Sequence, residues 1–137
     1  MPYLFDTSAL SEVLRPRPDA EFVSWLRDLP REEQFTSTIV VGELLAGALR
    51  SRAVEKWLGR IQQDILPAVT PLPFDLECAR EYGRVRAELM DAGTPIGDAD
   101  AMIAATALRH RLQVVTANVR HFGAVAGVTV RPVRIIG

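Results

Sequence analysis

The sequence predicts an α/β protein in which a parallel β-sheet is covered by helices on both faces. Short apolar runs alternate along the chain with longer segments in which apolar residues recur at helical spacing. Pro30 and Gly93 stand where two of the helical segments should end. Strands that alternate with helices are joined by crossover connections, so they pair in parallel and bury both faces of the sheet.

Five runs suit strands, and six segments have the pattern of helices. The expected strands cover residues 3–5, 34–38, 69–72, 112–116 and 128–133. The expected helices cover residues 8–14, 19–29, 39–49, 53–65, 74–93 and 98–110, and residues 117–127 are expected to form a loop. Three prolines near the run at 69–72 predict a short strand or one at the edge of the sheet. The strand order stays open, because the middle of the chain is rich in helix.

The composition is that of a soluble globular protein, and we expect a single domain over residues 1–137. The one cysteine, Cys78, allows no internal disulfide and gives no metal-binding spacing, which favours a reducing compartment, the cytoplasm. The N-terminus has no basic leader before an apolar segment, and the longest apolar stretch is short and contains Glu43. We therefore expect neither a signal peptide nor a membrane span. The net charge of −1 does not indicate a nucleic-acid binder, although every basic residue except Lys56 is an arginine, which suits phosphate contacts.

Two acids stand at the start of an apolar helix in the stretch PIGDADAMIAATAL, residues 95–108. Asp98 follows a loop and suits the N-cap of this helix, where a carboxylate opposes the positive end of the helix dipole. Asp100 is explained less well as a cap, because it shares a side of the helix with Ile103 and Ala104, which should face the core. This position favours a ligand role for Asp100 and leaves both roles open for Asp98.

Glu43 is expected on the apolar side of a helix. Its neighbours on that side are Ile39, Val40, Ala46 and Gly47. A carboxylate buried there must be protonated, paired with a base or bound to a cation. No Lys or Arg lies within one helical turn of Glu43, so its partner is either a distant arginine or a cation.

Polar residues also follow two of the expected strands. Asp6 comes directly after the run at 3–5, and Thr116 and Asn118 lie at the end of the run at 112–116. Each has an ordinary structural explanation, since Asp6 suits the N-cap of the next helix and Asn118 suits a turn. In a parallel sheet, however, the carboxyl ends of the strands are where ligands bind.

Together the acids predict a site for a divalent cation. Asp6, Glu43, Asp98 and Asp100 each lie where an apolar element begins or is interrupted. Clustered carboxylates repel one another unless a cation neutralises them, and oxygen ligands suit Mg²⁺ or Mn²⁺. The chemistry that fits best is hydrolysis of a phosphodiester by metal-activated water.

Other kinds of site fit the sequence less well. There is no glycine-rich phosphate loop and no GxSxG motif. A phosphoaspartate site needs a nearby lysine, and Lys56 lies in a helix with a surface pattern. A Ser–His–Asp hydrolase would need His110, expected in solvent at a helix end, or His121, expected in a loop at the margin of the site. A glycosidase is disfavoured because the chain shows no groove rich in aromatic residues.

The order of four motifs resembles that of the PIN-domain ribonucleases. The motifs are DTSAL at 6–10, GELLAG at 42–47, GDADAMIAATA at 97–107 and VVTANVRHF at 114–122. The match is closest to the bacterial VapC-like toxins of type II toxin–antitoxin systems, and the stretches at 14–26 and 65–89 resemble the FitB branch of that group. The resemblance implies a Rossmann-like α/β/α sandwich with a central parallel sheet, and endoribonuclease activity at an acidic Mg²⁺ or Mn²⁺ site.

The resemblance also implies a role for particular residues. The first, second and third acids of the family fall on Asp6, Glu43 and Asp100, and Asp98 is an accessory acid. Much of the family has a fourth Asp where this chain has Asn118, which lowers the negative charge and leaves the number of metal ions open. Supporting hydrogen bonds are expected from Thr7, Ser8 and Thr116, and contacts to RNA phosphates from Arg86 and Arg120.

Family members are usually homodimers that are inhibited by a small VapB- or FitA-like antitoxin, whose tail occupies the groove of the active site. The antitoxin carries the DNA-binding part, so the resemblance implies contact with operator DNA only through that complex. A second interpretation stays open, in which this chain is a weakly active or inactive partner of a DNA-binding antitoxin. Asn118 favours that second interpretation, whereas the three intact acids favour the enzyme.

Overall fold

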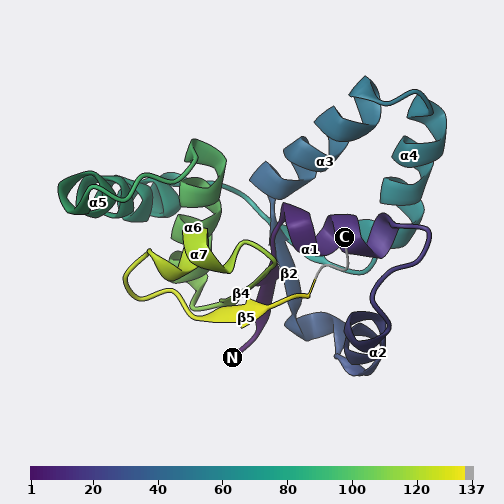
Figure 1. Ribbon diagram of the computed structural model, residues 1–137, viewed down its shortest axis with the longest axis horizontal. Coiled ribbons are helices and arrows are strands. Elements are labelled where there is room, and N and C mark those ends of the chain that lie inside the picture. Colours follow the sequence, from purple (N-terminus) through teal and green to yellow (C-terminus); the bar gives the residue numbers. More distant parts are fainter. Residues whose placement is uncertain (135–137) are drawn as a thin grey trace.

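In the computed structural model, which describes residues 1–134, five parallel strands form one sheet in the order β3-β2-β1-β4-β5 (Figure 1). The strands are β1 (Tyr3–Phe5), β2 (Gln34–Ser37), β3 (Thr70–Leu72), β4 (Gln113–Thr116) and β5 (Val130–Pro132). All five expected strands are confirmed, and β3 lies at an edge of the sheet, as its prolines predicted. The sheet and its flanking helices confirm the α/β/α architecture.

The sheet grows in both directions from β1. β2 and β3 are added on one side of β1, and β4 and β5 on the other. The register pairs Phe5 with Thr36 of β2 and with Val115 of β4, so these three strands end at the same edge. Open parallel sheets bind ligands where the order of strands reverses, at the carboxyl ends of the strands. The residues that occupy this switch point are Asp6, directly after β1, and Thr116, the last residue of β4.

Helices connect these strands, and all six expected helices are confirmed. A turn of π-helix over Ile61–Ile65 continues the fourth of them, and a turn of 3₁₀-helix covers Arg31–Glu33 before β2. The six helices are α1 (Thr7–Leu14), α2 (Ala20–Asp28), α3 (Thr38–Arg50), α4 (Val54–Arg60), α5 (Leu76–Ala92) and α6 (Asp98–His110).

A seventh helix, α7 (Val119–Gly123), replaces part of the loop expected at 117–127. The expectation of a loop was wrong because five residues are too few to show a helical period in the sequence. Phe122 anchors α7, since its side chain is fully buried against the core. The helix therefore holds His121 and Asn118 in fixed positions beside the end of β4.

The core is built on the two central strands. Leu4 and Phe5 of β1 and Val114 and Val115 of β4 have no exposed surface. α6 packs against α5, and five of the 13 residues of α6 are alanines, whose small side chains allow close approach of the two backbones. Cys78 of α5 is a free, buried thiol in this layer.

α3 and α4 pack against each other and project from the sheet on the side away from α5 (Figure 1). This pair of helices, residues 38–60, is called the arm below. The sheet edge that carries Asp6 thus lies between this arm and the α5–α6 layer. Within residues 1–134, none of the helices has both the length and the apolar character that crossing a membrane requires.

The end of α6 stores backbone strain that a single substitution should relieve. Arg111 ends the helix with φ of 55°, in the left-handed region that only glycine adopts at low cost. We expect Arg111→Gly to raise the free energy of unfolding by about 1 kcal/mol. Arg109→Gly, two residues earlier in the exposed last turn, should lower it by about 1 kcal/mol, since glycine weakens a helix interior. Urea titration measures the free energy of unfolding of both variants. A loss of stability in Arg111→Gly would contradict the assignment of strain.

Candidate active site

Asp6 is the buried centre of the polar residues at the switch point. Its side chain is 1% exposed, and it accepts hydrogen bonds from three groups. Oδ1 accepts from Ser8 Oγ at 2.7 Å and from the backbone N–H of Ala9 at 2.9 Å, and Oδ2 accepts from Thr116 Oγ1. Asp6 is thus the N-cap of α1, as the sequence allowed, and it also joins β1 to β4.

Burial raises the pKa of Asp6 above its ordinary value of 3.8. The hydrogen bonds from Thr116, Ser8 and Ala9 lower the pKa but do not cancel the effect of burial, and the negative charge of Asp100 raises it further. Within residues 1–134, no Lys or Arg forms an ion pair with Asp6. A cation bound beside Asp6 and Asp100 would remove both penalties at once.

Glu43 reaches the same region from the arm. Its Oε1 accepts a hydrogen bond from the hydroxyl of Thr7, the residue after Asp6. The expectation that Glu43 sits on a buried apolar side was wrong, because its side chain is exposed. α3 leaves the sheet at this point, so Ala46 and Gly47, on the same side of the helix, face open space as well. Only Val40, near the start of α3, is buried on that side.

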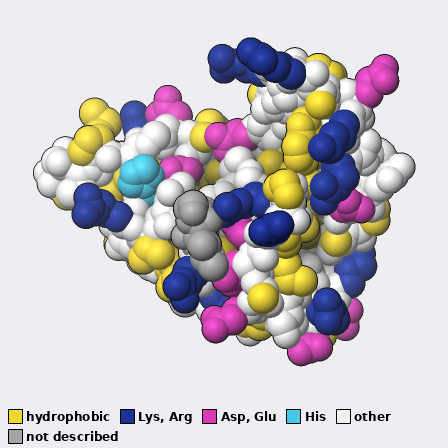
Figure 2. Space-filling model, turned by 45° about the vertical axis from the view of Figure 1, so that its right-hand side comes forward, with side chains coloured by type: hydrophobic (Ala, Val, Ile, Leu, Met, Phe, Trp, Pro, Cys, Tyr) yellow, Lys and Arg dark blue, Asp and Glu magenta, His cyan; other side chains and the backbone are white. Residues whose placement is uncertain are grey.

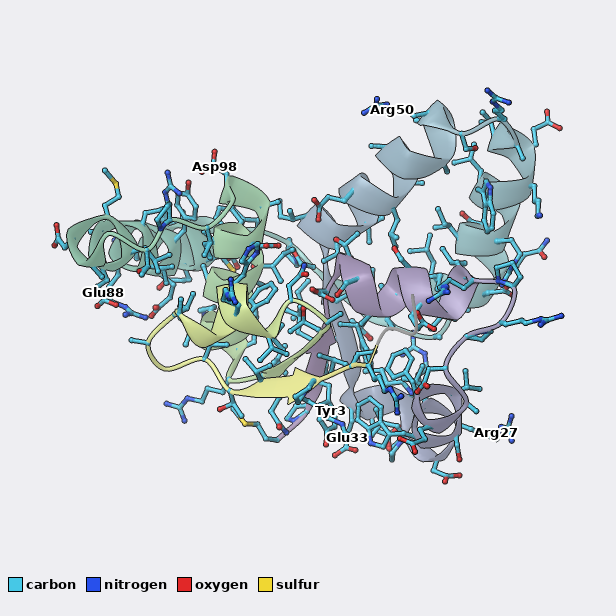
Figure 3. All side chains as sticks on the ribbon, viewed as in Figure 1. Tyr3, Arg27, Glu33, Arg50, Glu88 and Asp98 are labelled. Atoms are coloured by element: carbon cyan, nitrogen blue, oxygen red, sulfur yellow. The ribbon has the colours of Figure 1, made fainter. Side chains whose placement is uncertain are left out.

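Asp98 and Asp100 differ in their surroundings at the start of α6. The N-cap is Gly97, which makes no side-chain hydrogen bond, so the expectation that Asp98 caps the helix was wrong. Asp98 is 69% exposed and points outward from the top of α6, where it pairs with Arg86 at 3.2 Å (Figure 3). Asp100 is 22% exposed and lies close enough to Asp6 to raise its pKa. Asp100 is therefore partly buried beside Asp6, whereas Asp98 lies at the solvent-exposed rim of the site.

His121 is the residue of this region that the sequence reasoning missed. Its Nδ1 lies 2.9 Å from Oδ2 of Asp100, although it was expected only at the margin of the site. The signal in the sequence was the spacing of His121 and Asn118, which is one helical turn, but it becomes readable only once α7 is known. The side chain of Asn118 itself is exposed and forms no capping bond.

The two arginines expected to contact RNA lie in different settings. Arg86 of α5 is held by Asp98 and also donates to the carbonyl oxygen of Ile96 at 3.3 Å. Arg120 is exposed in α7, and within the described part of the chain it forms no ion pair. Arg86 thus already has an acidic partner, whereas Arg120 has none among residues 1–134.

The donor set fits a hard divalent cation. Asp6, Asp100 and Glu43 offer oxygen atoms, and the first two repel each other across a partly dry space. Among residues 1–134, no three acidic, histidine or cysteine side chains are gathered closely enough to hold a metal as they stand. In this region the Glu43 carboxylate accepts its hydrogen bond from the hydroxyl of Thr7.

A groove of about 450 Å³ extends from this edge between α1, α3 and α4. Thr7 and Glu43 stand at its acidic end, and the remaining lining is mostly apolar. The apolar lining residues include Leu14, Leu44, Gly47, Ala48, Trp57 and Ile61. Basic side chains border apolar ones on this face of the molecule (Figure 2).

Comparisons with known proteins agree with this architecture. The model of the PIN domain matches residues 3–128. Toxin FitB of Neisseria gonorrhoeae is 39% identical over 124 residues, which cover 87% of this chain and 89% of that protein. The tRNA(fMet)-specific endonuclease VapC of Salmonella typhimurium is 31% identical over 128 residues, which cover 93% of this chain and 95% of that protein.

Solved structures extend the similarity to complexes. The FitAcB structure from Neisseria gonorrhoeae superposes with a TM-score of 0.85 at 36% identity, covering 95% of this chain and 97% of that one. DNA-bound VapBC from Salmonella typhimurium superposes with a TM-score of 0.87 at 29% identity, covering 96% and 98%. The fold and the match over residues 3–128 define a PIN domain. The chain belongs to this family, and within it to the VapC-like toxins of type II toxin–antitoxin systems.

The raised pKa of Asp6 predicts that this acid lowers the stability of the folded protein by an amount that depends on pH. An acid with a raised folded pKa keeps its proton in the folded chain over a window in which the unfolded chain has lost it. Stability from this group therefore falls as pH rises through that window, which begins near 3.8. We expect Asp6→Asn to melt at a higher temperature than the natural protein at pH 7 in EDTA, and the gain to vanish at pH values below the window.

Thermal unfolding between acid and neutral pH measures this difference, with Asp91→Asn on the exposed side of α5 as the matched control. The control should show no gain that depends on pH. A lower melting temperature for Asp6→Asn at pH 7 would show instead that the three hydrogen-bond donors require a full carboxylate.

Proposed function

We propose that the chain is a metal-dependent endoribonuclease, the toxin of its toxin–antitoxin pair, with Asp6, Glu43 and Asp100 as its catalytic acids. The observation that carries the proposal is the pair of carboxylates at the switch point, one of them buried and neither paired with a Lys or Arg within residues 1–134. Such a pair is costly unless a cation binds it. Membership of the VapC-like group and relatives named ribonuclease or endonuclease support RNA as the substrate.

Asp6, Asp100 and Glu43 would hold Mg²⁺ or Mn²⁺, directly or through water, with Asp98 as an accessory acid. The ion supplies a Lewis acid that activates water and offsets charge on the scissile phosphate. Ser8 and Thr116 fix the Asp6 carboxylate in one orientation, and Thr7 restrains Glu43. Arg120 would hold a flanking phosphate, whereas Arg86 keeps Asp98 and the start of α6 in place.

The structure also suits a protein inhibitor of the kind that the VapBC and FitAB complexes contain. We propose a VapB- or FitA-like antitoxin as the partner, with an apolar segment in the groove between α1, α3 and α4. The apolar lining fits such a segment, and the acidic end at Glu43 would accept a basic side chain from it. The same proposal includes a homodimer that works in the cytoplasm and meets operator DNA only through its antitoxin.

A second function, as a weakly active partner in an operon-regulating complex, is favoured by two observations. The similar structures include FitAB bound to an IR36 DNA fragment, at 34% identity and a TM-score of 0.83. The exposed amide of Asn118 adds no negative charge where much of the family has an acid. RNA cleavage by the antitoxin-free protein separates the two functions.

The primary test is cleavage of total RNA by the antitoxin-free protein. We expect discrete fragments with Mg²⁺ or Mn²⁺, none with EDTA, and a loss of at least about 100-fold in rate for Asp6→Asn and Asp100→Asn, because each removes a charge that holds the ion. Asp91→Asn is the matched control and should cleave normally. An intact rate in Asp6→Asn would exclude Asp6 as an essential acid. No cleavage by folded protein that binds the ion would favour the regulatory function.

Blocking the groove should separate inhibition from catalysis. Gly47 lines the groove and a Cβ at this position would meet nothing within 4 Å, so Gly47→Trp is chosen to project a large ring into the groove. We expect this variant to cleave RNA while escaping inhibition by its antitoxin. The dissociation constant of its complex with the antitoxin should rise at least about ten-fold. Gly83→Trp, at an open position on α5 away from the groove, serves as the control. Unchanged inhibition of Gly47→Trp would place the antitoxin elsewhere.

A further inference from the structure

α7 places a nitrogen donor directly on one of the proposed catalytic acids. His121 Nδ1 lies 2.9 Å from Asp100 Oδ2, and the pair joins α7 to the first turn of α6. Asp100 is 22% exposed and His121 is 49% exposed, so the contact lies at the mouth of the acidic site. No other hydrogen bond or ion pair to the Asp100 side chain occurs within residues 1–134.

The direction of this hydrogen bond follows from the chemistry of the acid. A carboxylate that holds a metal ion is ionised, and an ionised carboxylate only accepts hydrogen bonds. Nδ1 of His121 must therefore carry a proton and donate a hydrogen bond to Oδ2. This arrangement occupies one oxygen of Asp100 and leaves Oδ1 for the ion or its water. It also places a donor beside the charge that would otherwise repel Asp6 without relief.

The backbone that carries His121 is anchored by its own helix, α7. Phe122, the next residue, is fully buried, and the N–H of Phe122 donates to the carbonyl oxygen of Asn118 at 3.3 Å. The Asn118 amide itself reaches none of the acids through a hydrogen bond. The contribution of α7 to the site thus comes from His121, one turn later, and it is a hydrogen-bond donor rather than an acid.

We propose that His121 is a positioning residue, which orients the Asp100 carboxylate for the divalent ion. The inference rests on the proposed function, because it needs Asp100 to be a metal ligand. Outer groups that hydrogen-bond to a ligating side chain fix its orientation, and their loss weakens metal binding by about 10- to 100-fold. His121 acts through Asp100 and does not touch the RNA.

The test is Mn²⁺ binding to the full, antitoxin-free chain, measured by titration calorimetry without RNA. His121→Ala removes the donor and should raise the dissociation constant for Mn²⁺ by about 10- to 100-fold. His121→Asn keeps an N–H near the position of Nδ1 and should restore most of the affinity. Val119→Ala, an exposed change in the same helix, is the matched control and should bind as the natural protein does. Thermal unfolding in EDTA checks that every variant is folded.

Cleavage kinetics separate positioning from direct contact with RNA. A positioning role predicts that excess Mn²⁺ restores the rate of His121→Ala and that the KM for RNA is unchanged. The proposal is overturned if His121→Ala binds Mn²⁺ as tightly as the natural protein, if His121→Asn is as impaired as His121→Ala, or if the KM rises and excess Mn²⁺ does not help. It is also overturned if the natural protein binds no Mn²⁺.

The two proposals can fail independently. Binding of Mn²⁺ that depends on His121, in a protein that cleaves no RNA, would support the positioning role and reject the ribonuclease. Metal-dependent cleavage with the same Mn²⁺ affinity in His121→Ala would reject the positioning role alone.

Discussion

The burial of one carboxylate, that of Asp6, is the constraint on which the rest of the site depends. The acid stands where the strand order reverses, and its two oxygens face donors from α1 and from the end of β4. These donors compensate only part of the cost of burial, so its pKa stays raised. A fold organised only for stability would place an apolar or neutral residue here. The buried carboxylate destabilises the folded state, and a bound cation would offset part of that cost.

The three neighbouring acids add negative charge around Asp6, and they differ in how far they are exposed to solvent. Asp100 is partly buried and repels Asp6, Glu43 is exposed and restrained by Thr7, and Asp98 lies at the rim on Arg86. The gradient runs from the dry interior of the sheet toward solvent, which is the direction from which RNA would arrive. Charge that would be harmful in the core is thus concentrated at a single edge, between the α3–α4 arm and the α5–α6 layer (Figure 1).

The arm explains how one edge can serve both a substrate and an inhibitor. Because α3 leaves the sheet after Val40, its later turns expose Glu43 and Gly47 to a groove whose lining is mostly apolar. An apolar lining is unsuited to RNA but suits a protein segment, whereas the acidic end suits a metal or a basic side chain. The two ligands would therefore overlap only at the acids, which is sufficient for inhibition.

Within residues 1–134, the sequence by itself determined the five strands, six of the seven helices and the places of Asp6 after β1 and of Asp100 in the first turn of α6, because hydrophobic period and strand ends are local signals. Only the tertiary structure decided that Gly97 rather than Asp98 stands at the N-cap of α6, that Glu43 is exposed, and that His121 contacts Asp100. The reason is physical. A side chain's exposure depends on whether another element covers it, and the α6–α7 contact joins two helices that β4 separates in the sequence. Residues 21 positions apart carry no local signal of such a contact.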